Sequence, residues 1–350
     1  MLCYRLKLGR SNFNYESRLS KFNVHKLETR RKYFDFVFLH KIVHSFVDTP
    51  NLLSQLNFNI KYNTFLRAYS AKTEVPKFET LAVSVPKKNV FHVELNRPKK
   101  VNTFSKAMWL ELKECFLALS DHPECRVIVL SGQGKHFTGG IELTSLVEMA
   151  QEAEELPDTA RKARYHYKFI KYAQNGISAL EECVKPVIVV THNACVGAGV
   201  DLVTAADIRY CTQDAWFQIK EVEVGLAADV GTLQRFPKVV SNTSIARELC
   251  YTGRKFDATE AQQIGLVSKV FPDKDSALKH VLEVADDIAS KSPVAVQTTK
   301  QSLVYSQSRP NEKGLEHIRL LNMSMNQGED LPKAAMAQAT KGPPPEFDNL

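Results

Sequence analysis

Hydrophobic positions in the middle of the chain follow two strand-like patterns. Residues 89–96 (NVFHVELN) alternate between polar and apolar, whereas residues 126–132 (RVIVLSG) and 186–197 (PVIVVTHNACVG) contain continuous apolar runs. Alternation predicts a half-buried strand, and a short apolar run bounded by turn residues is consistent with a strand buried on both faces. We therefore expect three strands here, the last of which ends in a Gly-rich turn.

Segments with helical spacing lie between and after these strands. Residues 105–120 have apolar positions at helical intervals, and a short helix over 200–208 leads into a strand-like stretch over 208–218. Beyond about residue 242 the pattern is helical, with predicted helices over 242–251, 258–265, 276–291, 295–306 and 313–325. Strands that alternate with helices and end at Gly-rich turns predict an α/β fold.

Charge divides the chain into a basic leader and a nearly neutral body. Residues 1–73 contain 13 Lys or Arg and 4 Asp or Glu, and the remaining residues have a balance of −2 within the total of +7. The basic character therefore gives no indication that the body binds nucleic acid. We interpret residues 1–73 as a transit peptide or a disordered extension, 74–240 as the core, 241–340 as a helical carboxyl-terminal region and 341–350 as a stiff, exposed tail.

Composition and short motifs exclude several classes of protein. The sequence contains no apolar run of membrane-spanning length, so we expect no membrane span. Its seven cysteines form no CxxC pair, which favours a reducing compartment. Two histidines in HKIVH (40–44) have helical spacing, but the Glu that a zinc protease carries between them is missing, so we expect no metal site.

Nucleotide-binding and serine-hydrolase motifs are also incomplete. The GxG in VGAGVDL (196–202) is followed by Leu202 where a dinucleotide fingerprint has its third glycine, and Lys135 is followed by His136 where a P-loop has Ser or Thr. The chain has no GxSxG elbow. Any catalytic residues must therefore lie outside these motifs.

Two Gly-rich turns, FTGGIEL (137–143) and VGAGVDL (196–202), each follow a predicted strand. Such turns allow backbone N–H groups to face a common point. One N–H from each turn could bind a single oxygen, which is the arrangement of an oxyanion hole. The alternative is that both are ordinary tight turns.

Three acids lie close to the second turn in the sequence. Asp201 directly follows it, Glu221 comes 20 residues later, and Asp229 lies among small and apolar residues in GLAADVG (225–231). An acid in apolar surroundings is usually paired, protonated or functional, and we expect its pKa to be raised. Each also has a structural explanation: a helix N-terminus could stabilise Asp201, Glu221 could be a surface residue, and Asp229 could cap a helix.

The stretch 85–310 resembles the crotonase (enoyl-CoA hydratase/isomerase) superfamily. The matching segments are NRPKKVNTFS, GKHFTGGIEL, KPVIVVTHNACVGAGVDLVTAADIRYCTQDAWF and EVGLAADVGTLQRFPKVV. The resemblance implies a crotonase-like spiral of ββα units, with a helical carboxyl-terminal region that mediates assembly into homotrimers or homohexamers. It places the oxyanion hole at the N–H groups of Ile141 and Ala198, and implies that the substrate-binding residues are Gly140, Ile141, Glu142, Leu143, Thr144 and Gly199.

Residues 207–235 are similar to the family's isomerases of 3,5-dienoyl-CoA thioesters. This resemblance implies an enzyme of fatty acid beta-oxidation that moves two double bonds, giving the 2,4-dienoyl-CoA. Glu221 and Asp229 would transfer protons at C2 and C6, and Asp201 would be an accessory acid. Either Glu221 or Asp229 could remove the C2 proton. Two positions depart from the family: Ala198 stands where Gly is common, and Glu142 where Asp is usual.

The same resemblance leaves two other functions open. One is another crotonase reaction, chiefly enoyl-CoA hydration, which does not require Asp229. The other is a non-catalytic scaffold that binds CoA or RNA, against which the three acids argue. Coenzyme A would be part of the substrate, a fatty acyl-CoA thioester, and no separate cofactor is expected. The basic leader and the absence of a terminal Ser-Lys-Leu favour the mitochondrial matrix, with the peroxisome as the alternative.

Overall fold

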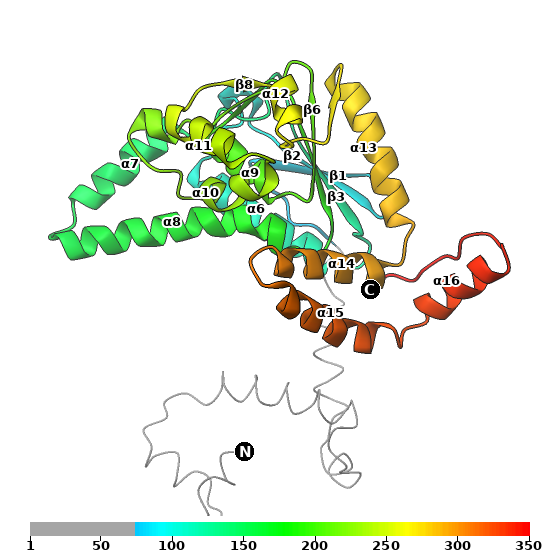
Figure 1. The fold of residues 1–350 in the computed structure, drawn as a ribbon. Helices are drawn as coiled ribbons and strands as arrows, with labels where there is room; N and C mark the ends of the chain where they lie inside the picture. Colours follow the sequence, from blue (N-terminus) through cyan, green and yellow to red (C-terminus); the bar gives the residue numbers. More distant parts are fainter. Residues whose placement is uncertain (1–73) are drawn as a thin grey trace, which may run out of the picture. The chain divides into compact units, whose positions relative to one another are not determined.

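Two β-sheets form the framework of the protein (Figure 1). The structure, a computed structural model, describes residues 74–350. The larger sheet has the order β1-β2-β3-β4-β6-β9, and the smaller one has the order β5-β7-β8. Within the larger sheet only β1 and β2 are antiparallel. The strands are β1 (Leu81–Lys87), β2 (Val90–Leu95), β3 (Val127–Gly132), β4 (Val187–Thr191), β5 (Ala194–Val196), β6 (Ile208–Thr212), β7 (Trp216–Gln218), β8 (Phe256–Asp257) and β9 (Lys269–Phe271).

From β4 to β7, consecutive strands alternate between the two sheets, and each pair of strands is followed by a helical segment. β4 belongs to the larger sheet and β5 to the smaller one, and α9 (Ala198–Ala205) follows; β6 and β7 repeat this step. Each ββα unit therefore advances the chain along both sheets. This arrangement confirms the predicted α/β class and the crotonase-like spiral.

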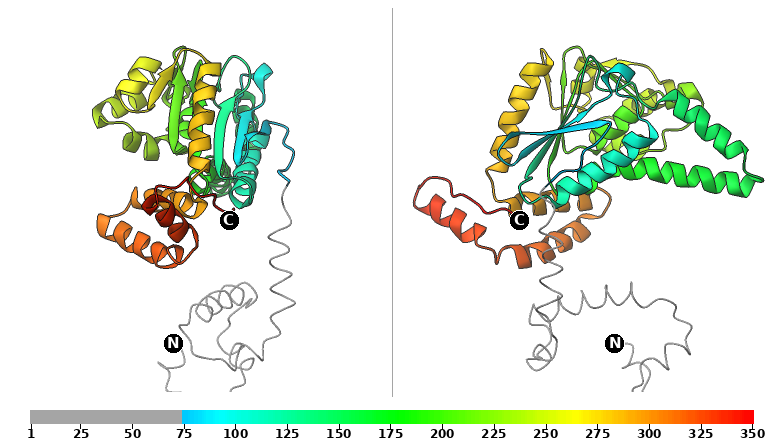
Figure 2. Two further views of the ribbon diagram at one scale, coloured as in Figure 1. Left: turned by 90° about the vertical axis from the view of Figure 1, so that its right-hand side faces the viewer. Right: turned by 180° about the vertical axis from the view of Figure 1, so that it is seen from behind.

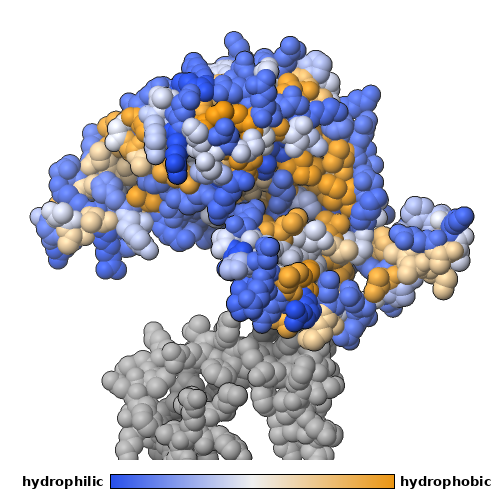
Figure 3. Space-filling model, viewed as in Figure 1, coloured by the Kyte–Doolittle hydropathy of each residue, from blue (hydrophilic) through white to orange (hydrophobic). Residues whose placement is uncertain are grey.

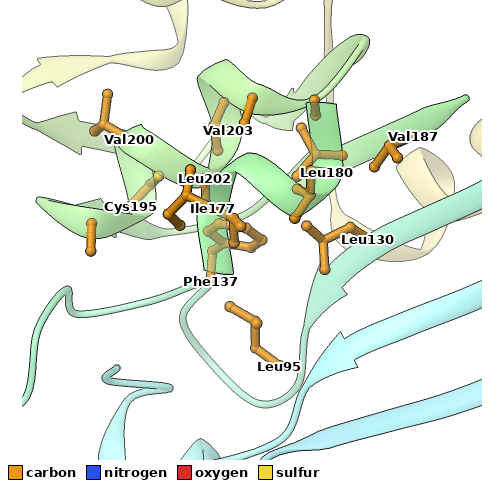
Figure 4. Packing of buried hydrophobic residues seen from close by; sticks show 14 of the residues in the cluster. Leu95, Leu130, Phe137, Ile177, Leu180, Val187, Cys195, Val200, Leu202 and Val203 are labelled. Atoms are coloured by element: carbon orange, nitrogen blue, oxygen red, sulfur yellow. The ribbon is translucent and has the colours of Figure 1, made fainter. Parts of the chain in front are cut away.

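The central strands are apolar on both faces because each face is covered by helices. Ile128 and Leu130 of β3 belong to the core cluster that includes α8 (Thr159–Glu182) and α9, whereas Val127 and Val129 pack toward α13 (Lys274–Ala289) on the opposite face. Figure 4 shows Leu130 and Val187 lying with Ile177 and Leu180 of α8. Such two-sided burial explains the uninterrupted apolar run in the sequence of β3.

All of the helices predicted from the sequence are present. Residues 105–120 form α6 (Lys106–Asp121), and the five carboxyl-terminal predictions correspond to α11 (Thr243–Thr252), α12 (Ala258–Gln263), α13, α14 (Pro293–Ser306) and α15 (Asn311–Met325). The remaining helical segments are α7 (Leu143–Glu154), α8, α10 (Thr232–Val239), α16 (Asp330–Ala339) and the 3₁₀ turns η1 (Pro98–Lys100) and η2 (Glu221–Val224). Figure 2 shows α7 and α8 on one side of the sheets and α13 on the other.

The region after residue 241 is not purely helical. Strand β9 pairs with β6 in the larger sheet, and α13 covers one of its faces. The packed core therefore extends past the expected boundary at 240/241. In the tail, Arg126 donates hydrogen bonds to the Phe347 carbonyl (2.6 Å) and to Asn349 Oδ1 (2.7 Å), so the end of the chain contacts the core.

The long helix α8 begins at a side-chain cap and packs closely on α6. The Asp158 side chain accepts a hydrogen bond from the N–H of Arg161, which satisfies a free donor of the first turn. A Cβ atom at Gly176 would lie 2.6 Å from the Trp109 carbonyl oxygen. Glycine at this position therefore permits the close approach of the two helices.

Several predictions fall on residues that the structure does not describe. The proposed transit peptide and the HKIVH motif (40–44) lie outside the described residues. Within residues 74–350, no helix combines the length and the apolar character that crossing a bilayer requires. The six cysteines in this range are buried and free of disulfides.

Candidate active site

The two Gly-rich turns lie side by side. The N–H of Thr138 donates to the Ala194 carbonyl (2.9 Å), and the N–H of Val196 donates to the Thr138 carbonyl (3.2 Å). Gly140 has a φ of +88°, and a Cβ atom there would lie 2.9 Å from the Val196 carbonyl oxygen. The first turn is therefore hydrogen-bonded to β5 and reaches the second, as the sequence predicts.

Each turn carries an unused backbone N–H. Phe104 binds both neighbours of Ile141: its N–H donates to the Gly140 carbonyl (2.9 Å), and its carbonyl accepts from the N–H of Glu142 (3.0 Å). In extended backbone this directs the N–H of Ile141 to the opposite side. Ala198 is the first residue of α9, where an N–H has no partner within the helix. In the described part of the chain, neither N–H donates to a protein acceptor.

Alanine at position 198 does not strain the second turn. The positive φ, +51°, belongs to Gly197, whereas Ala198 already has helical geometry. Gly199, in contrast, has no room for a side chain, because a Cβ atom there would lie 2.4 Å from Cγ2 of Thr138. The departure from the usual glycine at position 198 thus leaves the N–H available.

Asp201 is a buried acid with one hydrogen-bonded oxygen. It lies on α9 with only 1% of its surface exposed. Its Oδ1 accepts a hydrogen bond from the N–H of Thr232, the first residue of α10, whereas its buried Oδ2 has no partner. Burial raises the pKa of Asp201 to about 6, although the Thr232 hydrogen bonds and the charge of Arg235 act in the opposite direction.

Glu221 begins η2, directly after β7, and its carboxylate lies beside the second turn. A Cβ atom at Gly197 would be 3.3 Å from Glu221 Oε1, whereas Oε2 is buried without a hydrogen-bond partner. Burial and the charges of Asp201 and Asp229 raise the pKa of Glu221 to about 7. The carboxylate is therefore close to the N–H of Ala198 and able to hold or release a proton near neutral pH.

Asp229 lies in the loop between η2 and α10 and is exposed, not buried. Its backbone carbonyl accepts a hydrogen bond from Nε2 of Gln174 (2.7 Å). Partial loss of solvent still raises its pKa, in agreement with the expected direction. The alternative reading of Asp229 as a helix cap is wrong: Gly231 is the N-cap of α10, and Asp201 accepts the Thr232 N–H.

The other predicted substrate-binding residues lie at the start of α7. Leu143 and Thr144 are exposed there, and Gly140 and Ile141 form the turn before them. Glu142 forms ion pairs with Arg97 (3.0 Å) and with Lys100 (3.8 Å). Its carboxylate is thus held by two basic residues of the loop that precedes α6.

Sequence reasoning missed three residues around the acids: Gln174, Thr232 and Arg235. Thr232 and Arg235 follow Asp229 closely, but no motif distinguishes them from other helix residues. Gln174 lies 55 residues before its hydrogen-bond partner Asp229. In residues 74–350, no three His, Cys, Asp or Glu side chains are grouped so that they could bind a metal ion.

Comparisons with known proteins agree on one enzyme family. A family described as enoyl-CoA hydratase/isomerase matches residues 86–347. The mitochondrial Delta(3,5)-Delta(2,4)-dienoyl-CoA isomerase of Rattus norvegicus is 47% identical over 296 residues, which cover 82% of this chain and 90% of the rat protein. The peroxisomal enzyme of that name from Arabidopsis thaliana is 43% identical and covers 73% and 92% of the respective chains. The crystal structure of enoyl-CoA hydratase from Bacillus anthracis has a TM-score of 0.69 at 24% identity, over 77% of this chain and 99% of that one, which is a likeness of fold.

Proposed function

The chain belongs to the enoyl-CoA hydratase/isomerase family, and we propose that it converts 3,5-dienoyl-CoA to 2,4-dienoyl-CoA thioesters. The relatives from rat and from Arabidopsis thaliana that carry this activity in their names match most of the chain. The observation that carries the proposal is a second acid, Asp229, beside Glu221 and the two free N–H groups. Simple hydration of a 2-enoyl-CoA does not require this additional acid.

The reaction begins at C2, next to the thioester carbonyl. Removal of a C2 proton leaves an extended enolate whose negative charge is shared between the thioester oxygen and the conjugated carbons as far as C6. In this proposal the N–H groups of Ile141 and Ala198 stabilise the charge on the oxygen. A donor of this kind contributes about 3–4 kcal/mol to transition-state stabilisation.

We assign the C2 proton to Glu221 and the C6 proton to Asp229. The Glu221 carboxylate lies beside Gly197, one residue before the N–H of Ala198, and therefore beside the position of the thioester. Asp229 lies on the following loop, eight residues farther along the chain. C2 and C6 are separated by four bonds, so two carboxylates at different positions suit the transfer better than one.

Asp201 supports this pair without contacting the substrate. Its Oδ1 is bound to the N–H of Thr232, and its charge is one of the causes of the raised pKa of Glu221. We propose that it orients α10 and maintains the charge balance of the pair. The whole reaction is a redox-neutral proton transfer, so the carboxylates suffice for it and coenzyme A enters only as part of the substrate.

Exposed apolar side chains on the carboxyl-terminal helices support assembly into a homotrimer or homohexamer. Figure 3 shows hydrophobic residues at the surface of the α14–α15 region. The large exposed apolar side chains on α14, α15 and α16 are Leu303, Leu315, Leu320, Met323, Met325, Leu331 and Met336. A cluster of this kind is typical of an interaction surface. We place the protein in mitochondria, where the rat relative is located, with the peroxisome of the plant relative as the alternative.

An assay with two substrates tests the function. We expect the protein to convert a 3,5-dienoyl-CoA to the conjugated 2,4-dienoyl-CoA, followed by ultraviolet absorbance, and to hydrate a 2-enoyl-CoA far more slowly. Asp229→Asn should lower the isomerisation rate by at least about a hundredfold, since proton delivery by a positioned group contributes 10²–10⁴-fold. Circular dichroism provides the control for folding. Near-normal turnover by this variant would reject the assignment.

A further inference from the structure

A polar stripe on α8 faces the loop that carries Asp229. Gln174, Ser178 and Glu181 are spaced by four and three residues, so they share one face of the helix. All three contact the segment 229–235: Gln174 binds the Asp229 carbonyl, and the other two bind the side chain of Arg235. None of the three has a role in the proton transfers proposed above.

Arg235 is held to α8 by several hydrogen bonds. Its Nη2 donates to Glu181 Oε2 (2.7 Å) and to Ser178 Oγ (3.1 Å), and its Nε donates to Glu181 Oε2 (3.1 Å). The side chains of Arg235 and Glu181 are only 13% and 24% exposed. A charge-assisted pair in this partly buried setting fixes the guanidinium more firmly than a surface ion pair would.

The fixed guanidinium lies directly against the backbone of the acid-bearing loop. Gly231 has a φ of +145°, and a Cβ atom there would lie 2.1 Å from Arg235 Nη1. Glycine is therefore required both by the backbone conformation and by the close approach of Arg235. Gly231 is two residues after Asp229 and directly before Thr232, whose N–H binds Asp201.

The position of the Asp229 carboxylate depends on this backbone. In the described part of the chain, no side chain of another residue forms a hydrogen bond with that carboxylate. Its place is therefore determined by the loop, which is held at Asp229 by Gln174 and at Gly231 by Arg235. A small displacement of the loop would move the acid relative to C6 while leaving Glu221 beside Gly197.

We propose that Arg235, held by Glu181 and Ser178 of α8, is a positioning residue for Asp229, with Gln174 as a second support. This inference rests on the proposed isomerase function. In this role Arg235 determines how often the extended enolate is protonated at C6 and how often it is returned to the starting substrate by protonation at C2. A purely structural role would instead lower the amount of folded enzyme and reduce both outcomes equally.

The ratio of the two outcomes tests the proposal. In D₂O, the isomerisation rate is divided by the rate of deuterium incorporation at C2 of recovered 3,5-dienoyl-CoA, measured by mass spectrometry. We expect Arg235→Gln to lower this ratio about tenfold, because a 1 Å misplacement of a reacting group can cost as much as 10²-fold. Lys238→Gln is the matched control, since Lys238 is an exposed basic residue one turn farther along α10, and its ratio should match the wild type.

A second pair of variants keeps the test independent of the stability of Arg235→Gln. Gln174→Ala removes the hydrogen bond to the Asp229 carbonyl, whereas Asn175→Ala shortens the neighbouring amide side chain. The first should lower the ratio and the second should leave it unchanged. Wild-type ratios in both Arg235→Gln and Gln174→Ala would overturn the proposal; if Arg235→Gln does not fold, Gln174→Ala decides alone. A wild-type protein that neither isomerises nor exchanges would instead reject the function.

Discussion

Asp201, Glu221 and Asp229 have raised pKa values, and burial is the first cause at each. Asp201 is almost fully buried, but the N–H of Thr232 and the charge of Arg235 limit the rise to about 6. Glu221 is also buried and experiences the charges of the other two acids, while backbone hydrogen bonds act in the opposite direction, and its pKa reaches about 7. Both carboxylates can therefore hold a proton at a pH close to neutral.

The pair of Glu221 and Asp229 predicts a bell-shaped dependence of activity on pH. Transfer from C2 to C6 requires Glu221 to be ionised and Asp229 to be protonated, so the reactive form of the pair carries one proton. That form is lost when the pair gains a second proton at low pH or loses its only proton at high pH. We therefore expect kcat/KM to fall as pH rises through about 7, because above the raised pKa of Glu221 neither acid holds the shared proton. It should fall again at low pH, where both acids are protonated, and the raised pKa of Asp229 moves this lower limb to higher pH.

The measurement is kcat/KM for a 3,5-dienoyl-CoA from about pH 5 to about pH 9 at constant ionic strength. Product absorbance at each pH is corrected for enzyme inactivation by re-assay at a common pH. A rate that climbs through pH 7 to an alkaline plateau would contradict the requirement for one shared proton.

Lys300 of α14 is buried and contacts the carboxyl-terminal end of α8. Its Nζ donates hydrogen bonds to the carbonyls of Leu180 and Lys185, both at 2.9 Å. It also forms an ion pair with Asp207 Oδ2 (2.7 Å), and the residue is 5% exposed. The Leu180 carbonyl lies in the last turn of α8, where carbonyl groups have no donor within the helix. Lys300 therefore stabilises the end of the helix whose polar stripe holds the Asp229 loop.

Removing this lysine should destabilise the protein strongly. Lys300→Met leaves two carbonyls without their donor and removes the cation beside Asp207, which is 26% exposed and keeps its hydrogen bond from the N–H of Val187. Each buried polar group left unsatisfied in this way costs about 1–3 kcal/mol of unfolding free energy. Lys291→Met is the matched control, because Lys291 is 57% exposed and pairs only with Asp287 at the surface, where the cost is below about 1 kcal/mol. Urea denaturation measures both. Equal midpoints for the two variants would contradict the role of Lys300.

For the whole molecule, local patterns in the sequence predicted β2 to β7 and the two turns, but not β1, β8 or β9. The apolar run 127–130 predicted β3 because both of its faces are covered by helices, and the glycines at 140 and 197 marked the positions of positive φ. The two turns could be expected to lie next to each other because each follows a predicted strand. These features depend on residues close together in the chain.

Features set by tertiary contacts did not follow from the sequence. The apolar neighbours of Asp229 suggested burial, but its loop lies at the surface and the carboxylate is exposed. The residue that accepts the first N–H of α10 is Asp201, 31 positions earlier, and not the nearby Asp229. The support of the loop by Gln174 depends on how α8 packs beside it, which no local pattern encodes.

We propose that Glu221 acts at C2 and Asp229 at C6, and isotope exchange in D₂O is the most direct test of this division of roles. Asp229→Asn, Glu221→Gln and the wild type are incubated with a 3,5-dienoyl-CoA, and deuterium at C2 and C6 is located by NMR. Asp229→Asn should incorporate deuterium at C2 without forming the 2,4-dienoyl product, and Glu221→Gln should do neither. Loss of C2 exchange in Asp229→Asn together with its retention in Glu221→Gln would contradict the account.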